Sequence, residues 1–431
     1  MNICKNVDNR GICNIGASSS GYCQKRCSYF ESKHHNLKIF TDNVEQEALN
    51  QIDTLLSQDA FKDCKVRIMP DVHAGAGCVI GFTADLGKKV IPNIVGVDIG
   101  CGVLVVELGK IDIDFAKLDD VIRQYVPSGR NVHESVIQPF EKIQKMFCYR
   151  ELRDAKRLER SIGTLGGGNH FIEIDIDDDG NKYLVIHTGS RNLGKQVADY
   201  YQHLAIDLMS GKEEFFKSKD ALIEEYKASG RRSEIQAALK KMEKEFKAKN
   251  PDIPKDLCYL TGKYRDEYLR DMFICEEFAI INRAYISKII SYHMGWDWQK
   301  ESFESVHNYI DFDTNMVRKG AISAEKGERL IIPINMRDGS IIGTGKGNPD
   351  WNKSAPHGAG RIMSRMKARE TLDMQTYIQS MGGIYTSSVS KETIDEAPMA
   401  YKPIDEIVRN IEPTVRIDKI IRPVYNFKAV E

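Results

Sequence analysis

Side chains that can bind a metal ion recur in glycine-rich turns far apart along this chain of 431 residues. The first turn is Gly96-Val97-Asp98-Ile99-Gly100-Cys101-Gly102, where glycines free the backbone so that a carboxylate and a thiol can point the same way. The last candidate is His357. Because side chains that act together must meet in space, we expect the long segment between them to fold as one catalytic unit, although length alone suggests two or three domains.

Four of the ten histidines stand at polar, sharply turning positions of this kind. A single such histidine is more often a hydrogen-bonded structural residue than a metal ligand. Together with Asp98 and Cys101, however, four of them favour a site in which a thiolate bridges two divalent ions and imidazoles complete the ligand set. The four are His170, His187, His307 and His357.

The residue pattern predicts a mixed α and β fold. Strands and glycine turns are expected over residues 66–109, 161–190 and 320–345, and helices over residues 112–160 and 358–380. The charge-rich stretch from about residue 200 to 295 is expected to be a helical insertion with a projecting hairpin. An aliphatic helix around residues 278–290 then returns to the core.

Residues 1–35 are interpreted as a short N-terminal arm, and residues 36–431 as the catalytic domain. Two interpretations of the arm's cysteines stay open: a structural Zn²⁺ held by four thiolates, or free thiols, since only the last two cysteines have the spacing of a zinc-ligand pair. These cysteines are Cys4, Cys13, Cys23 and Cys27.

The chain carries no apolar signal segment and no stretch long enough to span a bilayer, so a cytoplasmic protein without a membrane partner is expected. Its formal net charge of −1 does not by itself indicate a nucleic-acid binder. An RNA-binding face would have to come from local clusters, and such clusters are also common on solvated helices. The candidates are Lys353, Arg361, Arg365, Lys367 and Arg369, and Lys156, Arg157 and Arg160.

Seven short segments combine glycines with histidines and charged residues. In order they are Met69-Pro70-Asp71-Val72-His73, Gly96 to Gly102, Gly163 to Glu173, His187-Thr188-Gly189-Ser190-Arg191, His307-Asn308-Tyr309, Gly345-Lys346-Gly347-Asn348 and His357-Gly358-Ala359-Gly360-Arg361. Their content and order resemble the motif series of the RtcB family, the GTP-dependent RNA-splicing ligases. The resemblance runs from about residue 66 to 428 and implies that family's layered single catalytic domain.

The resemblance also implies a three-step reaction with two Mn²⁺ ions. His357 would attack the α-phosphorus of GTP and hold GMP. The GMP would pass to an RNA 3′-phosphate, freed where necessary from a 2′,3′-cyclic phosphate, and a 5′-hydroxyl would displace it from the RNA(3′)pp(5′)G intermediate. Neutral imidazole suits the first two steps because it is both a nucleophile and a leaving group near pH 7.

Carried over residue by residue, the resemblance assigns roles to fourteen positions. The implied metal ligands are Asp98, Cys101, His170, His187 and His307, with Cys101 as the bridge. The implied catalytic residues are His357, Asp71 as the acid that orients it, and Arg361, which would face His357 only if that segment is helical. The implied nucleotide-binding residues are Asn169, Glu173, Asn308, Ser340, Tyr401 and Lys428. Of these, Glu173 would read guanine, because a carboxylate can accept from both N1 and N2 of that base.

One departure from the family pattern bears on the triphosphate: Ile334-Asn335-Met336 stands where many members have Gly-Ser-Met. Two other functions stay open, a two-metal phosphoesterase or nuclease and a non-catalytic RNA-binding repair subunit. The physiological RNA, whether from tRNA splicing or RNA repair, the metal actually bound and the need for an archease-type activator are not determined by the sequence.

Overall fold

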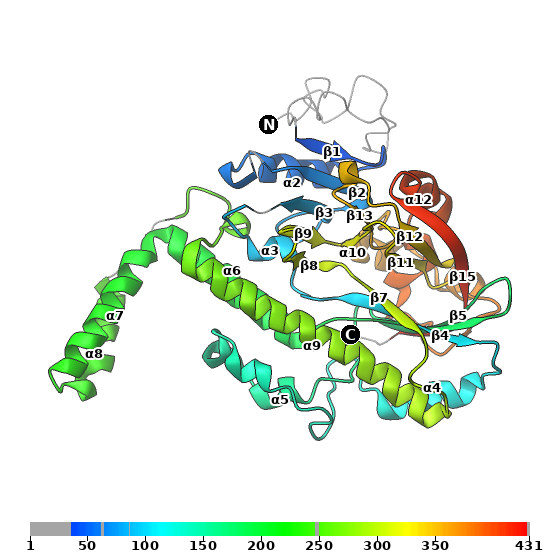
Figure 1. The fold of residues 1–431 in the computed structure, drawn as a ribbon, viewed down its shortest axis with the longest axis horizontal. Helices are drawn as coiled ribbons and strands as arrows, with labels where there is room; N and C mark the ends of the chain where they lie inside the picture. Colours follow the sequence, from blue (N-terminus) through cyan, green and yellow to red (C-terminus); the bar gives the residue numbers. More distant parts are fainter. Residues whose placement is uncertain (1–35, 62–63, 86, 246–249, 429–431) are drawn as a thin grey trace.

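A computed structural model describes residues 36–61, 64–85, 87–245 and 250–428. The fold is mixed α and β, as predicted, with two larger sheets and long helices against them (Figure 1). The cysteines of the N-terminal arm lie outside the described residues, so the zinc interpretation stays a prediction. No helix in the described ranges has the length and apolar character needed to cross a membrane.

The first sheet has five strands in the order β1-β2-β3-β9-β8. These strands are β1 (Leu37–Ile39), β2 (Val66–His73), β3 (Ile80–Asp85), β9 (Met316–Lys319) and β8 (Asn308–Asp311). Strand β2 is buried along almost its whole length, including the charged side chains of Arg67 and Asp71. Helices α2 (Gln46–Leu56) and α3 (Pro92–Val95) contribute buried residues to the same core.

The second sheet has eight strands, seven of them in the order β11-β12-β15-β5-β6-β4-β7. They are β11 (Arg329–Asn335), β12 (Gly339–Gly345), β15 (Val415–Lys428), β5 (Phe171–Ile176), β6 (Lys182–Thr188), β4 (Gly102–Gly109) and β7 (Ser302–Val306), with β14 (Tyr385–Thr386) beside β15. Strands β10 (Ala321–Ser323) and β13 (Ser354–Pro356) pair separately. Strand β15 therefore joins strands from the middle of the sequence to strands near residue 340.

Helix α9 (Gly262–Met294) packs against two other helices, α4 (Phe115–Tyr125) and α6 (Arg191–Asp207). Helix α9 runs across the molecule in Figure 1 and contacts α4, α6, β4 and β6. Its Ile286 and Ile290 pack with Ile172 and Ile186 of the larger sheet. Gly295 ends the helix in the left-handed conformation, with a φ of 75°.

The helical segment contains a projecting part and a core part. Helices α7 (Glu213–Ala228) and α8 (Ile235–Glu245) extend away from the rest of the molecule in Figure 1. They follow a π-helical segment, Leu208–Lys212, in which Gly211 has a φ of 87°. Helix α9, in contrast, is a core helix whose buried face includes the expected aliphatic stretch.

Two expected helices are divided differently in the structure. Over residues 112–160, α4 is followed by the 3₁₀ turns Glu141–Lys145 and Tyr149–Glu151 and by the short α5 (Ala155–Glu159). The expected helix over 358–380 is two helices, α10 (Arg365–Thr371) and α11 (Met374–Ser380). The side chains of Ser364 and Asp373 each accept a backbone hydrogen bond three residues on, so each begins a new helix. Helix α12 (Ile404–Ile411) follows later and buries Ile407 and Ile411.

Candidate active site

Neighbouring strand ends bring the predicted metal ligands together. Cys101 directly precedes β4, and β4 pairs with both β6 and β7, so that Gly102 lies opposite Thr188 and Val306. His187 stands at the end of β6, and His307 directly follows β7. Strand β5 pairs with β6 on its other side, which sets His170, one residue before β5, beside the same edge.

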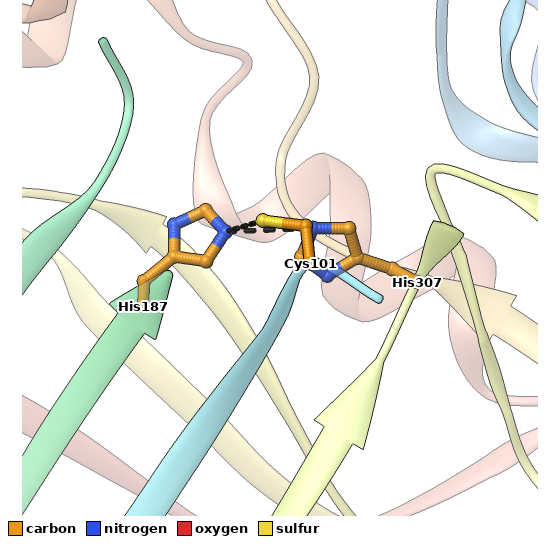
Figure 2. Close-up of side chains that lie close together, drawn as sticks. All are labelled: Cys101, His187 and His307. Atoms are coloured by element: carbon orange, nitrogen blue, oxygen red, sulfur yellow. Dashed lines mark hydrogen bonds between the residues drawn. The ribbon is translucent and has the colours of Figure 1, made fainter. Parts of the chain in front are cut away.

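The five side chains form two groups that share one thiol. Asp98 Oδ2 lies 2.9 Å from His170 Nε2, and Cys101 Sγ lies 3.5 Å from the same nitrogen. On the other side, Cys101 Sγ lies 3.3 Å from His187 Nε2, which lies 3.4 Å from His307 Nε2. Figure 2 shows Cys101, His187 and His307 pointing toward one another from their strands. In each group the ligand atoms lie within 4.8 Å of one another, which suits one divalent ion per group with Cys101 between them.

Backbone carbonyls fix the orientation of two of the imidazoles. His170 Nδ1 lies 2.9 Å from the carbonyl oxygen of Leu165, and His187 Nδ1 lies 3.1 Å from that of Asn169. An Nδ1–H donated to a carbonyl leaves the Nε2 lone pair for a metal. Both Nε2 atoms face the cluster, as a metal site requires.

The electrostatics of the cluster also fit a metal site. Burial lowers the pKa of His187 and His307, with neighbouring imidazoles adding to the effect, so both rings are neutral and able to bind a cation. Burial raises the pKa of the Cys101 thiol, and the nearby Asp98 carboxylate raises it further. A divalent cation would therefore supply the positive charge that a thiolate at this position needs.

Asn282 of α9 joins two of the loops that carry ligands. Its Oδ1 accepts hydrogen bonds from the backbone N–H groups of Gly163 and Thr164, at 2.8 and 3.0 Å. Its Nδ2 donates to the carbonyl oxygens of Thr164 and Gly189, each at 3.1 Å. The side chain is fully buried, so these bonds link the segment before His170 to the segment after His187 without competition from water.

The next residue, Arg283, forms hydrogen bonds with the backbone beside Cys101 and His187. Its Nη1 donates to the carbonyl oxygens of Gly100 and Thr188, at 2.8 and 2.9 Å, and its Nε donates to Glu304 at 2.8 Å. The guanidinium is fully buried. Two consecutive residues of one core helix thus hold the backbone next to Cys101 and His187.

His357 lies beside this cluster and is held by Asp71. Its Nδ1 lies 2.7 Å from Asp71 Oδ2, and its backbone N–H donates to the same oxygen at 3.1 Å. Asp71 is fully buried on β2, and the rings of His357 and His307 have their centroids 4.7 Å apart. With Nδ1 bonded to the carboxylate, Nε2 of His357 is the atom left for chemistry.

A pocket of about 190 Å³ opens next to His357. Predicted site residues that line it are Asn169, Glu173, His187, His357, Arg361, Tyr401 and Lys428. Residues that the sequence reasoning did not assign to the site also line it, among them His73, Asn335, Arg365 and Glu396. His73 had been noted only as part of a motif, Arg365 only in a basic cluster and Asn335 only as a departure from the family pattern, and Glu396 had not been noted.

Two predicted nucleotide-binding residues do not line this pocket. Ser340 is fully buried on β12, opposite Ile421 of β15, because its strand runs through the interior of the sheet. Asn335 lies in the pocket instead, where the register between β11 and β12 shifts. Asn308 donates from Nδ2 to the carbonyl oxygen of Asp98 at 3.1 Å, so it supports the metal-ligand loop rather than the pocket.

Arg361 does not face His357 through helical spacing, because no helix forms before Arg365. Its guanidinium points to Glu396: Nη1 lies 3.3 Å from Glu396 Oε1 and 3.2 Å from the hydroxyl of Tyr401. The other nitrogen, Nη2, donates to the carbonyl oxygen of Asp395 at 2.6 Å.

Glu396 gathers most of the charged groups of the pocket. It accepts hydrogen bonds from the Tyr401 hydroxyl at 2.6 Å and from Lys428, and it pairs with Arg365 at 2.7 Å. Burial by itself would raise the pKa of Glu396, but Lys428, Arg365 and Arg361 outweigh it and lower the pKa to about 2. The only signal in the sequence was an acidic pair five residues before Tyr401, which has no special spacing.

Glu173 lies on the same wall of the pocket. Its Oε1 accepts a hydrogen bond from Asn426 Nδ2 at 2.6 Å, since β5 and β15 pair at these two residues. Burial raises the pKa of Glu173 to about 7. Two residues along the strand, both carboxylate oxygens of Asp175 are buried without a hydrogen-bond partner among the described residues.

Fold and site together define a mixed α and β protein with a candidate two-metal centre beside a polar pocket that contains a carboxylate-bound histidine. A family model described as tRNA-splicing ligase RtcB matches residues 56–151 and 148–429. The chain therefore belongs to the RtcB family.

Relatives in bacteria and archaea agree with this assignment. RNA-splicing ligase RtcB of Escherichia coli K12 is 29% identical over 434 residues, which cover 91% of this chain and 97% of that protein. The tRNA-splicing ligase RtcB of Nanoarchaeum equitans is 27% identical, covering 84% of this chain and 87% of its own length. That of Pyrobaculum aerophilum is 25% identical, covering 90% and 93%.

Proposed function

We propose that this protein is a GTP-dependent RNA ligase that joins a 3′-phosphate or 2′,3′-cyclic phosphate end to a 5′-hydroxyl end. The observation that carries the proposal is His357, whose Nδ1 is bound to Asp71 and whose ring lies against that of His307 in the candidate metal centre. The relatives named RNA-splicing or tRNA-splicing ligases support the same reaction class.

The first step forms a bond between Nε2 of His357 and the α-phosphorus of GTP, and it breaks the bond to the β-phosphate so that pyrophosphate leaves. Where the RNA ends in a 2′,3′-cyclic phosphate, water first breaks the bond between phosphorus and the 2′-oxygen and leaves a 3′-phosphate. The RNA 3′-phosphate then attacks the α-phosphorus and releases the histidine. Finally, the 5′-hydroxyl attacks the RNA phosphorus and GMP leaves. Asp71 keeps the proton on Nδ1 and stabilises positive charge on the ring while GMP is attached.

Two divalent ions, which we propose are Mn²⁺, would be held by Asp98, Cys101 and His170 on one side and by Cys101, His187 and His307 on the other. Bound there, they would neutralise phosphate oxygens and favour in-line displacement. Arg361 and Arg365 supply further positive charge beside the pocket. Arg361 pairs with the carboxylate of Glu396, and Arg365 pairs with the carboxylates of Glu396 and Asp395.

Guanine recognition is assigned to Glu173, with Tyr401, Lys428 and Asn169 completing the pocket. The carboxylate can accept from two donors of guanine that adenine does not offer. Asn426 Nδ2 donates to Glu173 Oε1 and so orients the carboxylate for the base. Among the described residues, no side chain or backbone group donates to Glu173 Oε2, which leaves this oxygen for guanine.

The alternatives differ in what they require. A two-metal phosphoesterase would need the ligand cluster but not His357, Glu173 or Lys428, and a non-catalytic repair subunit would need none of them. The cytoplasmic location and an archease-type activator remain predictions that rest on the sequence alone.

Incubation with GTP labelled at the α-phosphate and Mn²⁺, followed by denaturing electrophoresis, separates these functions. A ligase forms an acid-labile GMP adduct that His357→Ala abolishes while metal content stays at the parental level. His203→Ala is the matched control, because this histidine is exposed on α6 and bonds only to its own helix backbone. An adduct retained in His357→Ala would remove this residue as the nucleophile.

A further inference from the structure

A second cavity, of about 480 Å³, shares Lys428 with the nucleotide pocket. It lies between Arg123 of α4, the loop of residues 128–131 and the segment of residues 387–392. No step proposed above uses this cavity.

Hydrogen-bond donors dominate its lining. The side chains of Ser128, Arg130 and Asn131 have no hydrogen-bond partner among the described residues, and Arg130 is exposed. Arg123 is held at the cavity wall by Asp119 at 2.7 Å and by Ser387. In the described lining, Glu392 is the only acidic residue. A ligand that fits this surface carries negative charge and several acceptor oxygens.

The loop that carries Arg130 is tied to the active site. Gly129 N–H donates to the carbonyl oxygen of Gly166 at 2.9 Å, and Arg191 Nη2 donates to the carbonyl oxygen of Gly129 at the same distance. Gly166 begins the segment that leads to His170. Four residues of extended chain span at most about 14 Å, so the loop stays within that order of distance from the metal ligands.

We propose that this cavity binds the phosphodiester backbone of the RNA strand whose end lies in the active site. This inference rests on the proposed function. A stacked strand advances about 3.4 Å per nucleotide, so a phosphate within about four nucleotides of the joined end reaches Arg130. Guanidinium, hydroxyl and amide donors are the groups that contact phosphate oxygens without reading sequence.

The two ends of the reaction offer two sources of this backbone, the 3′-phosphate strand and the 5′-hydroxyl strand. Both present the same chemistry to the cavity. RNAs that carry only one of the two reacting ends separate these sources. Substrate length separates backbone binding from binding of the reacting end, because only a strand that extends past that end by several nucleotides can place a phosphate in the cavity.

The test measures equilibrium binding of fluorescent single-stranded RNA of two and of ten nucleotides, each with either a 3′-phosphate or a 5′-hydroxyl reacting end. Arg130→Ala should weaken binding of the ten-nucleotide RNA about 3- to 10-fold and reduce the slope of log K against log salt by about 1. Glu392→Gln should strengthen binding of the same RNA. Dinucleotide binding should not change in either variant.

Arg232→Ala is the matched control, because Arg232 is an exposed arginine between α7 and α8 at the far end of the projecting helices. GMP labelling of His357 is measured in parallel without RNA and should be the same in all these proteins. An effect on one strand alone identifies the strand that occupies the cavity.

Equal binding of long RNA by the parent and Arg130→Ala, with equal salt slopes, overturns the inference while labelling leaves the proposed function intact. An equal loss for dinucleotide and long RNA also overturns it, since the cavity would then act at the reacting end. Absence of the GMP adduct in the parent contradicts the proposed function instead.

Discussion

His357 has one ring nitrogen committed to Asp71 and the other free, and this difference is what makes it a usable nucleophile. Asp71→Asn should lower the rate of GMP labelling by about 10²-fold or more, because an amide no longer favours the Nδ1–H tautomer or stabilises the charged ring. Single-turnover labelling with saturating GTP and Mn²⁺ measures this rate. Metal content should stay parental, since Asp71 lies outside both ligand groups; a variant that labels at the parental rate would show that Asp71 only fills space.

Base choice provides a second prediction for a single residue. Glu173→Gln should reduce the preference for GTP over ATP by more than about 10-fold, because an amide accepts from only one guanine donor and presents a donor to the other. Competition between the two labelled nucleotides measures it. If the variant discriminates as well as the parent, guanine is read by other groups.

The same substitution has an effect on stability that depends on pH. The raised pKa of Glu173 means that the folded state favours the protonated carboxyl, so this residue contributes most stability below its unfolded pKa. That contribution is lost as the pH rises toward about 7. Above this pH, the buried carboxylate lowers the free energy of unfolding by on the order of 3 kcal/mol relative to its value at low pH. Glu173→Gln should therefore gain thermal stability relative to the parent at pH 8 but not at pH 4.5. Equal differences in Tm at both pH values would contradict this.

At this scale the sequence indicated which side chains gather in the candidate metal centre better than which side chains line the pocket. Asp98, Cys101 and the histidines stand in short motifs whose residue types match their chemistry. Ser340 is buried within the sheet, whereas Asn335 lines the pocket. Glu396 lines the pocket because segments far apart in the sequence pack together there. Contacts of that kind depend on the register between β11 and β12 and on where a loop lies, which local spacing does not encode.

Among the elements, α9 supports the loops of the candidate metal centre through Asn282 and Arg283. Asn282→Asp keeps the Oδ1 acceptor and the size of the side chain but removes the donor that binds Thr164 and Gly189. We expect the folded variant to bind Mn²⁺ about 10- to 100-fold more weakly, because the loops beside His170 and His187 lose their common support. Calorimetric titration of the apoprotein with Mn²⁺ measures this without reference to activity.

Ser291→Ala on the same helix is the control, because this buried serine has no hydrogen-bond partner among the described residues. Its metal affinity should be parental. If Asn282→Asp lowers the melting temperature but binds Mn²⁺ like the parent, Asn282 stabilises the fold only.

The helix boundaries in the structure show which features of secondary structure the local sequence pattern predicts. The mixed α and β class followed from alternating strand and helix periods, and the aliphatic face of α9 was predicted as a core helix. The break at residues 372–373 was not, although Asp373 is a good helix N-cap, because an apolar period of 3.6 residues continues on both sides of it.

The whole molecule assembles its site from residues between 71 and 428, as the spread of ligand candidates required. Every residue proposed for chemistry therefore lies outside the N-terminal arm. Deleting residues 1–35 should leave GMP labelling of His357 near the parental rate while changing ligation of a structured RNA. Loss of labelling in a deletion protein that keeps its circular dichroism spectrum would make the arm part of the active site.

Strand β15 also sets the order in which this protein can be completed during synthesis. It lies between β12 and β5, so until residues 415–428 leave the ribosome the larger sheet remains two separate pieces, each with an unpaired edge. The same strand supplies Lys428, which lines the pocket, and Asn426, which hydrogen-bonds Glu173. The pocket is therefore incomplete in a nascent chain until β15 is made, and the exposed edges are the surfaces that a chaperone would need to protect until then.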